Sequence, residues 1–245
     1  MNRYLKFLLR FFRAQRLGIR FRGTSYTRFP RSFRFGGRVR DIRVPDHPLM
    51  ISDFIDIVLD DDYGLRGIRK APRVIVDIGA NVGHFCNYAR DRFPDAQIQA
   101  YEPSPDNAAL ARANTEHPGT RIFEEGVAGE DGRADLCEHG LSNIVQTRAS
   151  ADGAIALVSF ATVLARAGGH IDLLKVDCEG AEWDFMNRPD LFAHVDDIRM
   201  EYHLVDGRTL DDLTALAAGI RFRITHLREN QGFGIAWLAP QSAVN

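Results

Sequence analysis

Four carboxylates and one imidazole lie where two predicted strands end. Asp177, Glu179 and Glu182 follow the predicted strand that begins at residue 171, and Glu201 and His203 end the next one. Because the carboxyl ends of parallel strands meet at one edge of a sheet, these side chains share a crevice. Such clustering costs free energy unless a cation, a proton or substrate hydroxyls compensate the charge. The alternative is a purely structural role, in which Glu179 and Glu182 only cap the following helix.

A second stretch, residues 74–83, has the form of a strand, a glycine turn and the start of a helix. The β-branched run Val74–Ile78 is typical of a buried parallel strand. Gly79 allows a tight backbone turn, and Gly83 lets the helix approach the strand or a ligand closely. The stretch predicts a nucleotide site at the carboxyl edge of a doubly wound sheet.

Asp77 indicates which nucleotide cofactor this turn binds. Its carboxylate stands two residues before Gly79, where it would repel the pyrophosphate of a dinucleotide. The same charge suits a cationic ligand that carries a sulfonium and an α-amino group. We therefore expect S-adenosylmethionine rather than NAD.

The ends of the next two predicted strands complete the cofactor site. Glu102 lies 25 residues after Asp77, about where a doubly wound domain places the carboxylate that binds ribose hydroxyls. Each hydrogen bond from a hydroxyl to this carboxylate would contribute about 1.5–3 kcal/mol. The small and apolar residues 126–128 end the third strand, where they would lie against the adenine face.

From Pro72 onward, strands alternate with helices through short connections. This rhythm predicts an α/β fold with a doubly wound, mostly parallel, seven-stranded sheet and helices on both faces. The expected strands are 74–78, 98–102, 121–125, 171–177, 198–203, 222–227 and 233–238. The expected helices are 82–92, 105–116, 162–167, 181–186 and 210–218. Between the third and fourth strands, the polar segment 129–152 suggests only short strands around 134–138.

The charge is distributed unevenly along the chain, although its net value is only −2. The first 43 residues hold 13 of the 31 basic residues and one acid, which leaves 18 basic and 32 acidic residues in the remainder. We therefore divide the chain into a basic N-terminal extension, residues 1–70, and a cofactor-binding domain, residues 71–245. A basic arm on an acidic body suggests a partner for the arm.

The extension begins with a predicted basic amphipathic helix over residues 1–17. One interpretation is contact with an anionic membrane surface, and the other is docking on the core or on a second subunit in a homodimer. Residues 18–45 alternate basic and apolar types, which predicts one or two hairpins, and residues 51–65 predict a helix. Interleaved arginines and aromatics could meet nucleic acid, but the acidic body disfavours it.

The three cysteines, an odd number with no C-x-x-C pair, fit reduced thiols in a cytoplasmic protein. No apolar run is long enough to span a bilayer, and the N-terminus has no signal-peptide cleavage pattern. We expect a cytoplasmic location, with the inner face of the membrane as the site of any surface contact.

The motifs together resemble the FkbM family of S-adenosylmethionine-dependent methyltransferases. The resemblance runs from about Val74 to His203, roughly half the chain, and its combination of motifs is highly specific. Cys178 departs from the family, which usually has an aliphatic residue there, and this argues against a covalent cysteine mechanism. The matching pieces are VDIGANVG (76–83), YEPSP (101–105), GVA (126–128), Ser142-Asn143, LKVDCEGAE (174–182) and EYH (201–203).

The resemblance implies a class I methyltransferase fold and the methylation of hydroxyls on sugars, glycolipids or polyketides. It also implies a set of cofactor-binding residues. They are Asp77, Gly79, Ala80, Asn81, Val82, Gly83, Glu102, Pro103, Val127, Ser142, Asn143 and Asp177.

Methyl transfer to a hydroxyl requires alignment and removal of a proton. His203 is the first candidate for the base, with Asp177 or Glu179 as its orienting partner. The alternative is a divalent metal such as Mg²⁺ held by Asp177 and Glu201, which would lower the pKa of the hydroxyl. The catalytic set is therefore His203, Asp177, Glu179 and Glu201.

The favoured hypothesis is an O-methyltransferase that acts on a sugar, glycan or glycolipid. The alternatives are an O-methyltransferase of a soluble secondary metabolite of the polyketide type, an RNA methyltransferase, and a cofactor-binding module without catalytic activity. The intact set of Asp77, Glu102 and Asp177 argues against the last of these.

Overall fold

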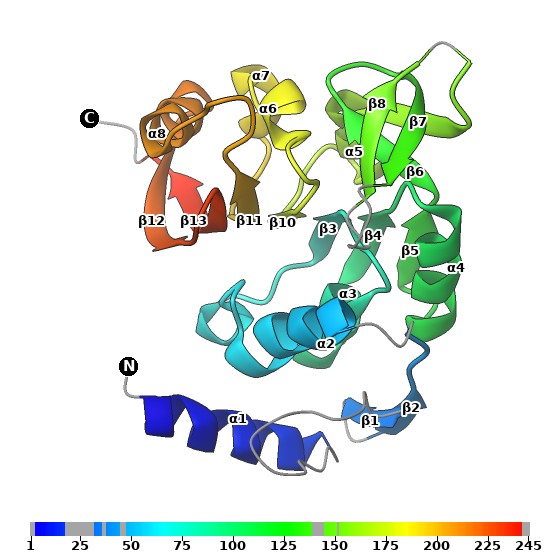
Figure 1. Ribbon diagram of the computed structural model, residues 1–245, viewed down its shortest axis with the longest axis vertical. Helices are drawn as coiled ribbons and strands as arrows, with labels where there is room; N and C mark the ends of the chain where they lie inside the picture. Colours follow the sequence, from blue (N-terminus) through cyan, green and yellow to red (C-terminus); the bar gives the residue numbers. More distant parts are fainter. Residues whose placement is uncertain are drawn as a thin grey trace.

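A seven-stranded sheet forms the centre of the molecule in the computed structural model, which describes residues 3–17, 32–35, 38–44, 48–138, 145–150 and 152–241 (Figure 1). Its strand order is β12-β13-β11-β10-β3-β4-β5. The bounds are β3 (Val74–Ile78), β4 (Gln97–Tyr101), β5 (Thr120–Phe123), β10 (Leu173–Val176), β11 (Ile198–His203), β12 (Phe222–Glu229) and β13 (Phe233–Pro240). All seven match predicted strands to within a few residues, so the predicted sheet is confirmed.

The sheet is parallel except at its C-terminal hairpin. β10 pairs in parallel with both β3 and β11, and β4 pairs in parallel with β3 and β5. β13 runs antiparallel to β11 and β12. In the β3–β10 pair, Lys175 stands opposite Asp77, so the strand register alone brings the lysine ammonium beside this carboxylate.

A second, four-stranded sheet accounts for most of the segment between β5 and β10. The prediction placed only short strands there and continued the third strand to residue 125. In the structure that strand ends at Phe123, and Glu125 already belongs to the second sheet, because the chain changes sheets at Glu124. The sheet has the order β6-β9-β7-β8, with β6 (Glu125–Ala128), β7 (Gly132–Glu138), β8 (Val145–Ala149) and β9 (Ile155–Ser159).

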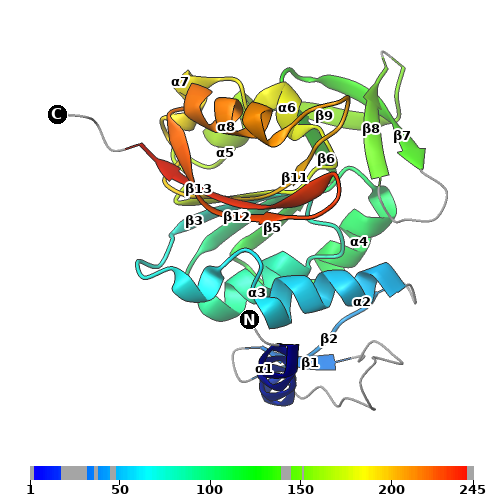
Figure 2. The ribbon, with the colours of Figure 1, turned by 60° about the vertical axis from the view of Figure 1, so that its left-hand side comes forward.

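Helices cover both faces of the central sheet, as Figure 2 shows. One face packs on α5, α6, α7 and α8, whose buried side chains include Phe160, Phe185, Phe192 and Leu213. The other packs on α3 and the N-terminal helical segments. The bounds are α3 (His84–Arg92), α4 (Pro105–Asn114), α5 (Phe160–Arg166), α6 (Glu182–Phe185), α7 (Pro189–Phe192) and α8 (Leu210–Gly219).

The N-terminal extension shares a hydrophobic core with the sheet. Ala14, Ile42 and Phe54 are buried in one cluster with Ile75 of β3 and Phe85 of α3. The predicted first helix and one hairpin are confirmed, while residues 18–31 lie outside the described residues. The elements are α1 (Arg3–Arg16), β1 (Ser32–Phe35), β2 (Arg38–Asp41), α2 (Pro48–Phe54), η1 (Ile55–Asp60) and η2 (Leu65–Gly67).

The helix predicted over residues 51–65 is not one regular helix. α2 continues into η1, a π-helical segment that ends at Asp61 in the left-handed region, with φ 65°. A π-helical turn is wider than an α-helical turn and occurs mainly at functional sites. It places Asp56 against the carboxyl edge of the sheet, where the site lies, while Asp60 pairs with Arg10 of α1.

Among the described residues, no helix combines the length and the apolar character that crossing a bilayer requires.

The turn after β3 gives a direct test of the fold. Gly79 has φ 79°, and a Cβ there would overlap the carbonyl oxygen of Asp177. We expect Gly79→Ala to lower the free energy of unfolding by about 2–5 kcal/mol, measured by urea denaturation. Gly168 is the matched control, since its φ is 81° and no atom of the described residues lies within 4 Å of a Cβ added there. Gly168→Ala should cost only about 1–2 kcal/mol, and equal losses in the two variants would contradict the close approach.

Candidate functional site

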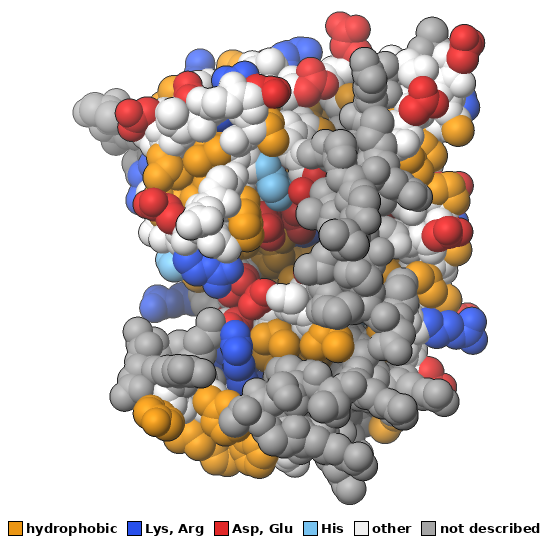
Figure 3. All heavy atoms as spheres, viewed as in Figure 1, with side chains coloured by type: hydrophobic (Ala, Val, Ile, Leu, Met, Phe, Trp, Pro, Cys, Tyr) orange, Lys and Arg blue, Asp and Glu red, His pale blue; other side chains and the backbone are white. Residues whose placement is uncertain are grey.

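A cavity of about 630 Å³ opens at the carboxyl ends of β3, β4, β10 and β11. This volume is typical of a small-molecule site. Figure 3 shows acidic side chains gathered in the hollow at the middle of this face. The acidic residues that line the cavity come from the extension, the strand ends and the C-terminal hairpin; they are Asp53, Asp56, Asp62, Glu102, Glu125, Asp177, Glu179, Glu201 and Glu229.

The glycine turn forms one wall of the cavity. The backbone N–H groups of Gly79 and Ala80 both donate to the carbonyl oxygen of Tyr101, at 2.9 and 3.0 Å. Asn81 lines the cavity with φ 48°, and Glu179 across the cavity has φ 55°. Left-handed backbone at non-glycine residues costs free energy and concentrates at functional sites. Both positions support a ligand-binding role for this cavity.

Beneath this wall lies a buried charge network. Lys175, which is 2% exposed, places Nζ 3.0 Å from Oδ1 of Asp77 and 3.5 Å from Oδ2 of Asp177. Nζ also donates to the carbonyl oxygens of Ile78 and Gly79. Burial alone would lower the pKa of Lys175, but the charges of Asp77 and Asp177 raise it above its ordinary value. Lys175 is therefore a permanent cation at the floor of the site.

This network corrects the interpretation of Asp77. Its side chain is fully buried and does not line the cavity, because Lys175 and the thiol of Cys86, 3.2 Å from Oδ2, surround it. The carboxylate is therefore compensated from within the protein and does not face a cationic ligand directly. What reaches the cavity from this position is the backbone turn that follows.

Glu102 ends β4 with its carboxylate at the cavity wall. Its two oxygens accept the backbone N–H groups of Asn81, at 2.8 Å, and Ser104, at 3.0 Å. Burial raises the pKa of Glu102, and these two hydrogen bonds oppose that rise. The carboxylate is thus fixed in position, with further lone pairs on both oxygens for the hydroxyls of a ligand.

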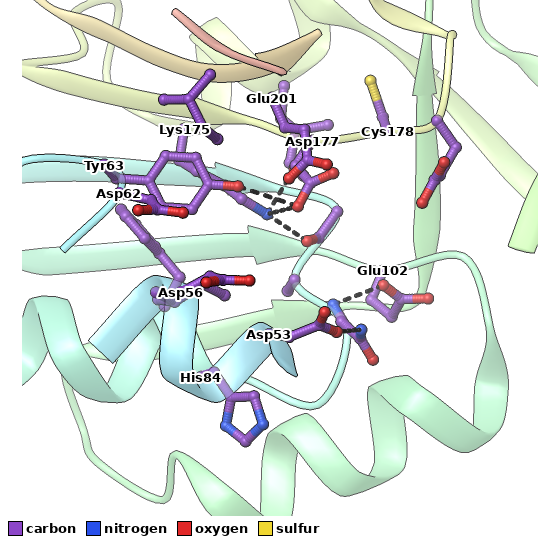
Figure 4. A pocket seen from close by; sticks show the side chains of 18 of the residues that line it. Asp53, Asp56, Asp62, Tyr63, His84, Glu102, Lys175, Asp177, Cys178 and Glu201 are labelled. Atoms are coloured by element: carbon purple, nitrogen blue, oxygen red, sulfur yellow. Dashed lines mark hydrogen bonds and ion pairs between the residues drawn. The ribbon is translucent and has the colours of Figure 1, made fainter. Parts of the chain in front are cut away.

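Asp177 stands at the end of β10 between the floor and the cavity. Its Oδ2 accepts a hydrogen bond from the Tyr63 hydroxyl at 3.1 Å and lies beside Lys175 (Figure 4). Burial and the charge of Asp177 raise the pKa of Tyr63 well above its usual value, so the phenol remains a donor. Tyr63 and Lys175 together orient the Asp177 carboxylate.

The predicted base, His203, is held by three carboxylates. Its Nδ1 lies 3.3 Å from Glu182, and its Nε2 lies 3.2 Å from Glu179 and 3.9 Å from Glu201. Burial would lower the pKa of His203, but the hydrogen bond and charge of Glu182, followed by Glu179, raise it to about 9. With these neighbours, His203 is an imidazolium at neutral pH.

The pKa of Glu201, which lies beside His203, is raised as well. Burial, followed by the charge of Asp177, raises the pKa of Glu201 to about 9. Ligand atoms of Asp177, Glu201 and His203 lie within 4.8 Å of one another, which is close enough to hold one cation. The structure thus brings together the two predicted metal ligands and adds His203 to them.

Glu182 has a structural role that goes beyond capping the following helix, because it also holds His203. It begins α6, is fully buried, and accepts the backbone N–H of Gly180 at 2.9 Å and of His203 at 2.8 Å. It holds the imidazole in place without lining the cavity.

Other predicted residues fall into three groups. Gly79, Ala80, Asn81, Glu102, Pro103, Val127, Asp177, Glu179 and Glu201 line the cavity as expected. Asp77, Val82, Gly83 and His203 do not line it, although His203 contacts Glu179 and Glu201, which do. Ser142 and Asn143 lie outside the described residues.

Sequence reasoning missed the contribution of the extension. Asp53 in α2 accepts a hydrogen bond from the side-chain amide of Asn81 at 3.3 Å, and burial, then the charge of Asp177, raises its pKa to about 7. Nothing in the sequence distinguishes Asp53 from a surface acid on an amphipathic helix. Lys175 did leave a signal, since it is a charge between Leu174 and Val176 in an otherwise apolar strand.

These features fit S-adenosylmethionine. The glycine turn gives a backbone wall without side chains, and the fixed Glu102 carboxylate suits the ribose hydroxyls. Val127 and Tyr101 provide apolar surface at the same end. The acids at the opposite end suit the positive charges of the methionyl and sulfonium groups.

Comparison with known proteins finds a methyltransferase and a much longer synthetase among the relatives of this chain. The chain is 28% identical to methyltransferase sdnD of Sordaria araneosa, over 74% of this chain and 80% of that protein. It is 28% identical to the AMB antimetabolite synthetase AmbE of Pseudomonas aeruginosa over 68% of this chain, but spans only 10% of that much longer protein. A solved structure, precorrin-6y C5,15-methyltransferase from Geobacter metallireducens, matches with 12% identity and a TM-score of 0.48 over 75% of this chain and 87% of that one.

The family assignment rests on a match that covers the site itself. The methyltransferase FkbM domain matches residues 77–213, which is more than half of the 245 residues. The match begins at Asp77 and includes the glycine turn, Glu102, Asp177 and His203. The chain belongs to the FkbM methyltransferase family and is an S-adenosylmethionine-dependent methyltransferase.

Proposed function

We propose that this enzyme methylates a hydroxyl group of a sugar, glycan or glycolipid. The observation that carries the proposal is the set of carboxylates that line the cavity, contributed by the extension, the strand ends and the C-terminal hairpin. Ionised carboxylates accept hydrogen bonds only, so a cavity lined by them suits an acceptor that presents several hydroxyls.

The same charges disfavour an RNA acceptor. Nucleic-acid sites neutralise phosphates with lysines and arginines, whereas Asp53, Asp56, Asp62, Glu179 and Glu201 surround this cavity. On the wall beside them, Phe233 is 38% exposed and its ring centre lies 6.4 Å from that of His203. Phe233 offers an apolar platform for the less polar face of a sugar ring.

Each residue of the site has a role in this proposal. The cofactor supplies an activated methyl group on its sulfonium. The glycine turn and Glu102 fix the cofactor, while the carboxylates orient the acceptor hydroxyl, and alignment of this kind is worth up to about 7–11 kcal/mol. His203, held by Glu179 and Glu182, takes the hydroxyl proton once it is neutral. A cation bound in the cavity favours that neutral form, because like charges lower the pKa of an imidazolium.

A divalent metal is the alternative activator. Two carboxylate oxygens and one imidazole nitrogen from Asp177, Glu201 and His203 form a donor set that fits a hard or intermediate cation. A metal there would replace the proton that the raised pKa gives to Glu201. His203 cannot be both ligand and base, so the two mechanisms are distinguishable.

A soluble secondary metabolite is the second candidate acceptor. It is favoured by the relative AmbE, which is described as an antimetabolite synthetase. For either acceptor we expect a cytoplasmic location, because the sequence has an odd number of cysteines and no C-x-x-C pair.

The acceptor class is tested with methyl-labelled cofactor. The purified protein is incubated with glycolipid, free-glycan, hydroxylated-metabolite and RNA pools, and products are identified by the added methyl mass. A label in the glycan or glycolipid pools supports the proposal. A label confined to the metabolite or RNA pool would instead assign that class of acceptor. If none of the pools is labelled although the cofactor binds tightly, a non-catalytic module is favoured.

The Glu102 carboxylate provides the cofactor test. We expect Glu102→Gln to weaken S-adenosylmethionine binding by about 10–100-fold in calorimetry, because the charge-assisted hydrogen bonds to ribose are lost. Glu124→Gln is the matched control, since Glu124 lies outside the cavity and pairs with Arg112 at 2.9 Å on the surface. Equal affinity in the Glu102 variant and the wild type would refute the ribose role.

The pH dependence of kcat/KM tests the base. The pKa of His203 is raised to about 9, so the imidazole carries its proton at neutral pH and loses it as the pH rises. We therefore expect kcat/KM to increase with pH and to level off near pH 9. In His203→Gln the rate should fall by about 10²–10⁴-fold and the rise should disappear. A His203→Gln profile with the wild-type rise would assign the titration to another group.

Chelation tests the metal. If Asp177, Glu201 and His203 hold a divalent cation, dialysis against EDTA should abolish activity, and Mg²⁺ should restore it. The matched variant Glu201→Gln should then bind the cation more weakly in calorimetry. Full activity in excess EDTA would exclude the metal and leave the general-base mechanism.

A further inference from the structure

We propose that α1 is a docking surface for an anionic lipid membrane, held on the enzyme by its basic face and presenting its apolar face outward. This goes beyond the proposed function, because it holds whichever acceptor is methylated. It also reverses the orientation expected of a basic amphipathic helix on a globular body, whose apolar face normally turns inward.

The inward face of α1 is attached by charge. Arg10 donates to both carboxylate oxygens of Asp60, at 2.6 and 2.5 Å, and its guanidinium lies 4.0 Å from Asp56. Arg13 donates to the carbonyl oxygen of Leu59. Ala14 is fully buried in the core beneath. The two arginines therefore fix the helix to η1 and are used within the protein.

The outward face of α1 is apolar. Leu5, Leu8 and Phe12 are 50%, 49% and 61% exposed, and Tyr4 is 79% exposed. Figure 3 shows these hydrophobic side chains gathered at the lower edge of the molecule, over α1. Most of the large hydrophobic side chains that are exposed in the described part of the chain belong to this one helix. Contiguous apolar surface of this kind marks an interaction site.

Charge selects a membrane as the occupant of this surface. Beyond Arg10 and Arg13, which are used within the protein, the helix has three more basic residues and no acid, and the first 43 residues have 13 basic residues and one acid in all. Two copies of this chain packed through α1 would bring these arms together and repel each other. An anionic bilayer attracts basic residues near its surface, while leucine and aromatic side chains enter the acyl boundary.

The position of α1 gives the docking a consequence for the active site. α1 packs on η1, and Asp56 of η1 lines the cavity while lying 4.0 Å from Arg10. A helix is about 10–12 Å in diameter, so the lipid surface would lie about one helix away from the wall of the cavity. An acceptor anchored in that bilayer would thus be presented close to the site.

The experiment uses the full-length protein and vesicles in a flotation assay. We expect flotation with vesicles of phosphatidylcholine mixed with phosphatidylglycerol, and much weaker flotation with phosphatidylcholine alone or at high salt. The variant Leu5→Gln/Leu8→Gln/Phe12→Gln should bind at least about tenfold more weakly, since burial of even one such side chain is worth about that factor. Glutamine is a good helix former, so α1 should persist.

The control is Leu227→Gln, which removes a 38% exposed side chain on β12 and should leave flotation unchanged. Circular dichroism and thermal unfolding confirm that both variants are folded. Absence of flotation with anionic vesicles would overturn the proposal. Vesicle binding by the triple variant as strong as that of the wild type would also overturn it. The same holds if Leu5, Leu8 and Phe12 are required for a dimer or an RNA complex while vesicles are not bound.

Discussion

One buried ammonium group holds the carboxyl edge of the sheet together. Lys175 of β10 contacts Asp77 of β3, the carbonyl oxygen of Gly79 and Asp177, so it joins both central strands and the glycine turn. Removing one partner of a buried pair costs about 3–5 kcal/mol, because the remaining charge is left uncompensated. The shape of the cofactor wall, the orientation of Asp177 and the register of β3 with β10 therefore depend on the same interaction.

The acids that line the cavity are compensated less fully than the buried Asp77, and this determines the chemistry of the site. Asp53 and Glu201 have raised pKa values, to about 7 and about 9, because burial and the charge of Asp177 disfavour their ionised forms. His203 stays protonated between Glu179 and Glu182. Ligands with positive charge or several hydroxyl donors relieve this repulsion, so one acidic cavity suits a sulfonium cofactor and also the hydroxylated acceptor that we propose.

The extension belongs to the site and is more than an arm attached to a finished domain. Its π-helical segment places Asp56 and Ile57 at the cavity, and the loop that follows adds Asp62 and Tyr63. Asp62 in turn pairs with Arg228 of β12, so the extension and the C-terminal hairpin close the cavity from opposite ends of the chain. The family match begins only at Asp77, so this wall comes from residues that the family model does not cover.

The sequence by itself determined the sheet, the glycine turn and the strand-end positions of Glu102, Asp177 and Glu201, since strand periodicity, turn glycines and topology are local or short-range signals. Only the tertiary structure decided which partner each charge has. Asp77 looked like a ligand for a cation in the cofactor, but cross-strand register gives it Lys175 instead. The second sheet, the wall around Asp53 and the outward apolar face of α1 likewise depend on long-range packing. The pKa of His203 depends on its burial and on the charges of Glu182, Glu179 and Asp177, which the preceding strand and turn bring beside it and which no local pattern specifies.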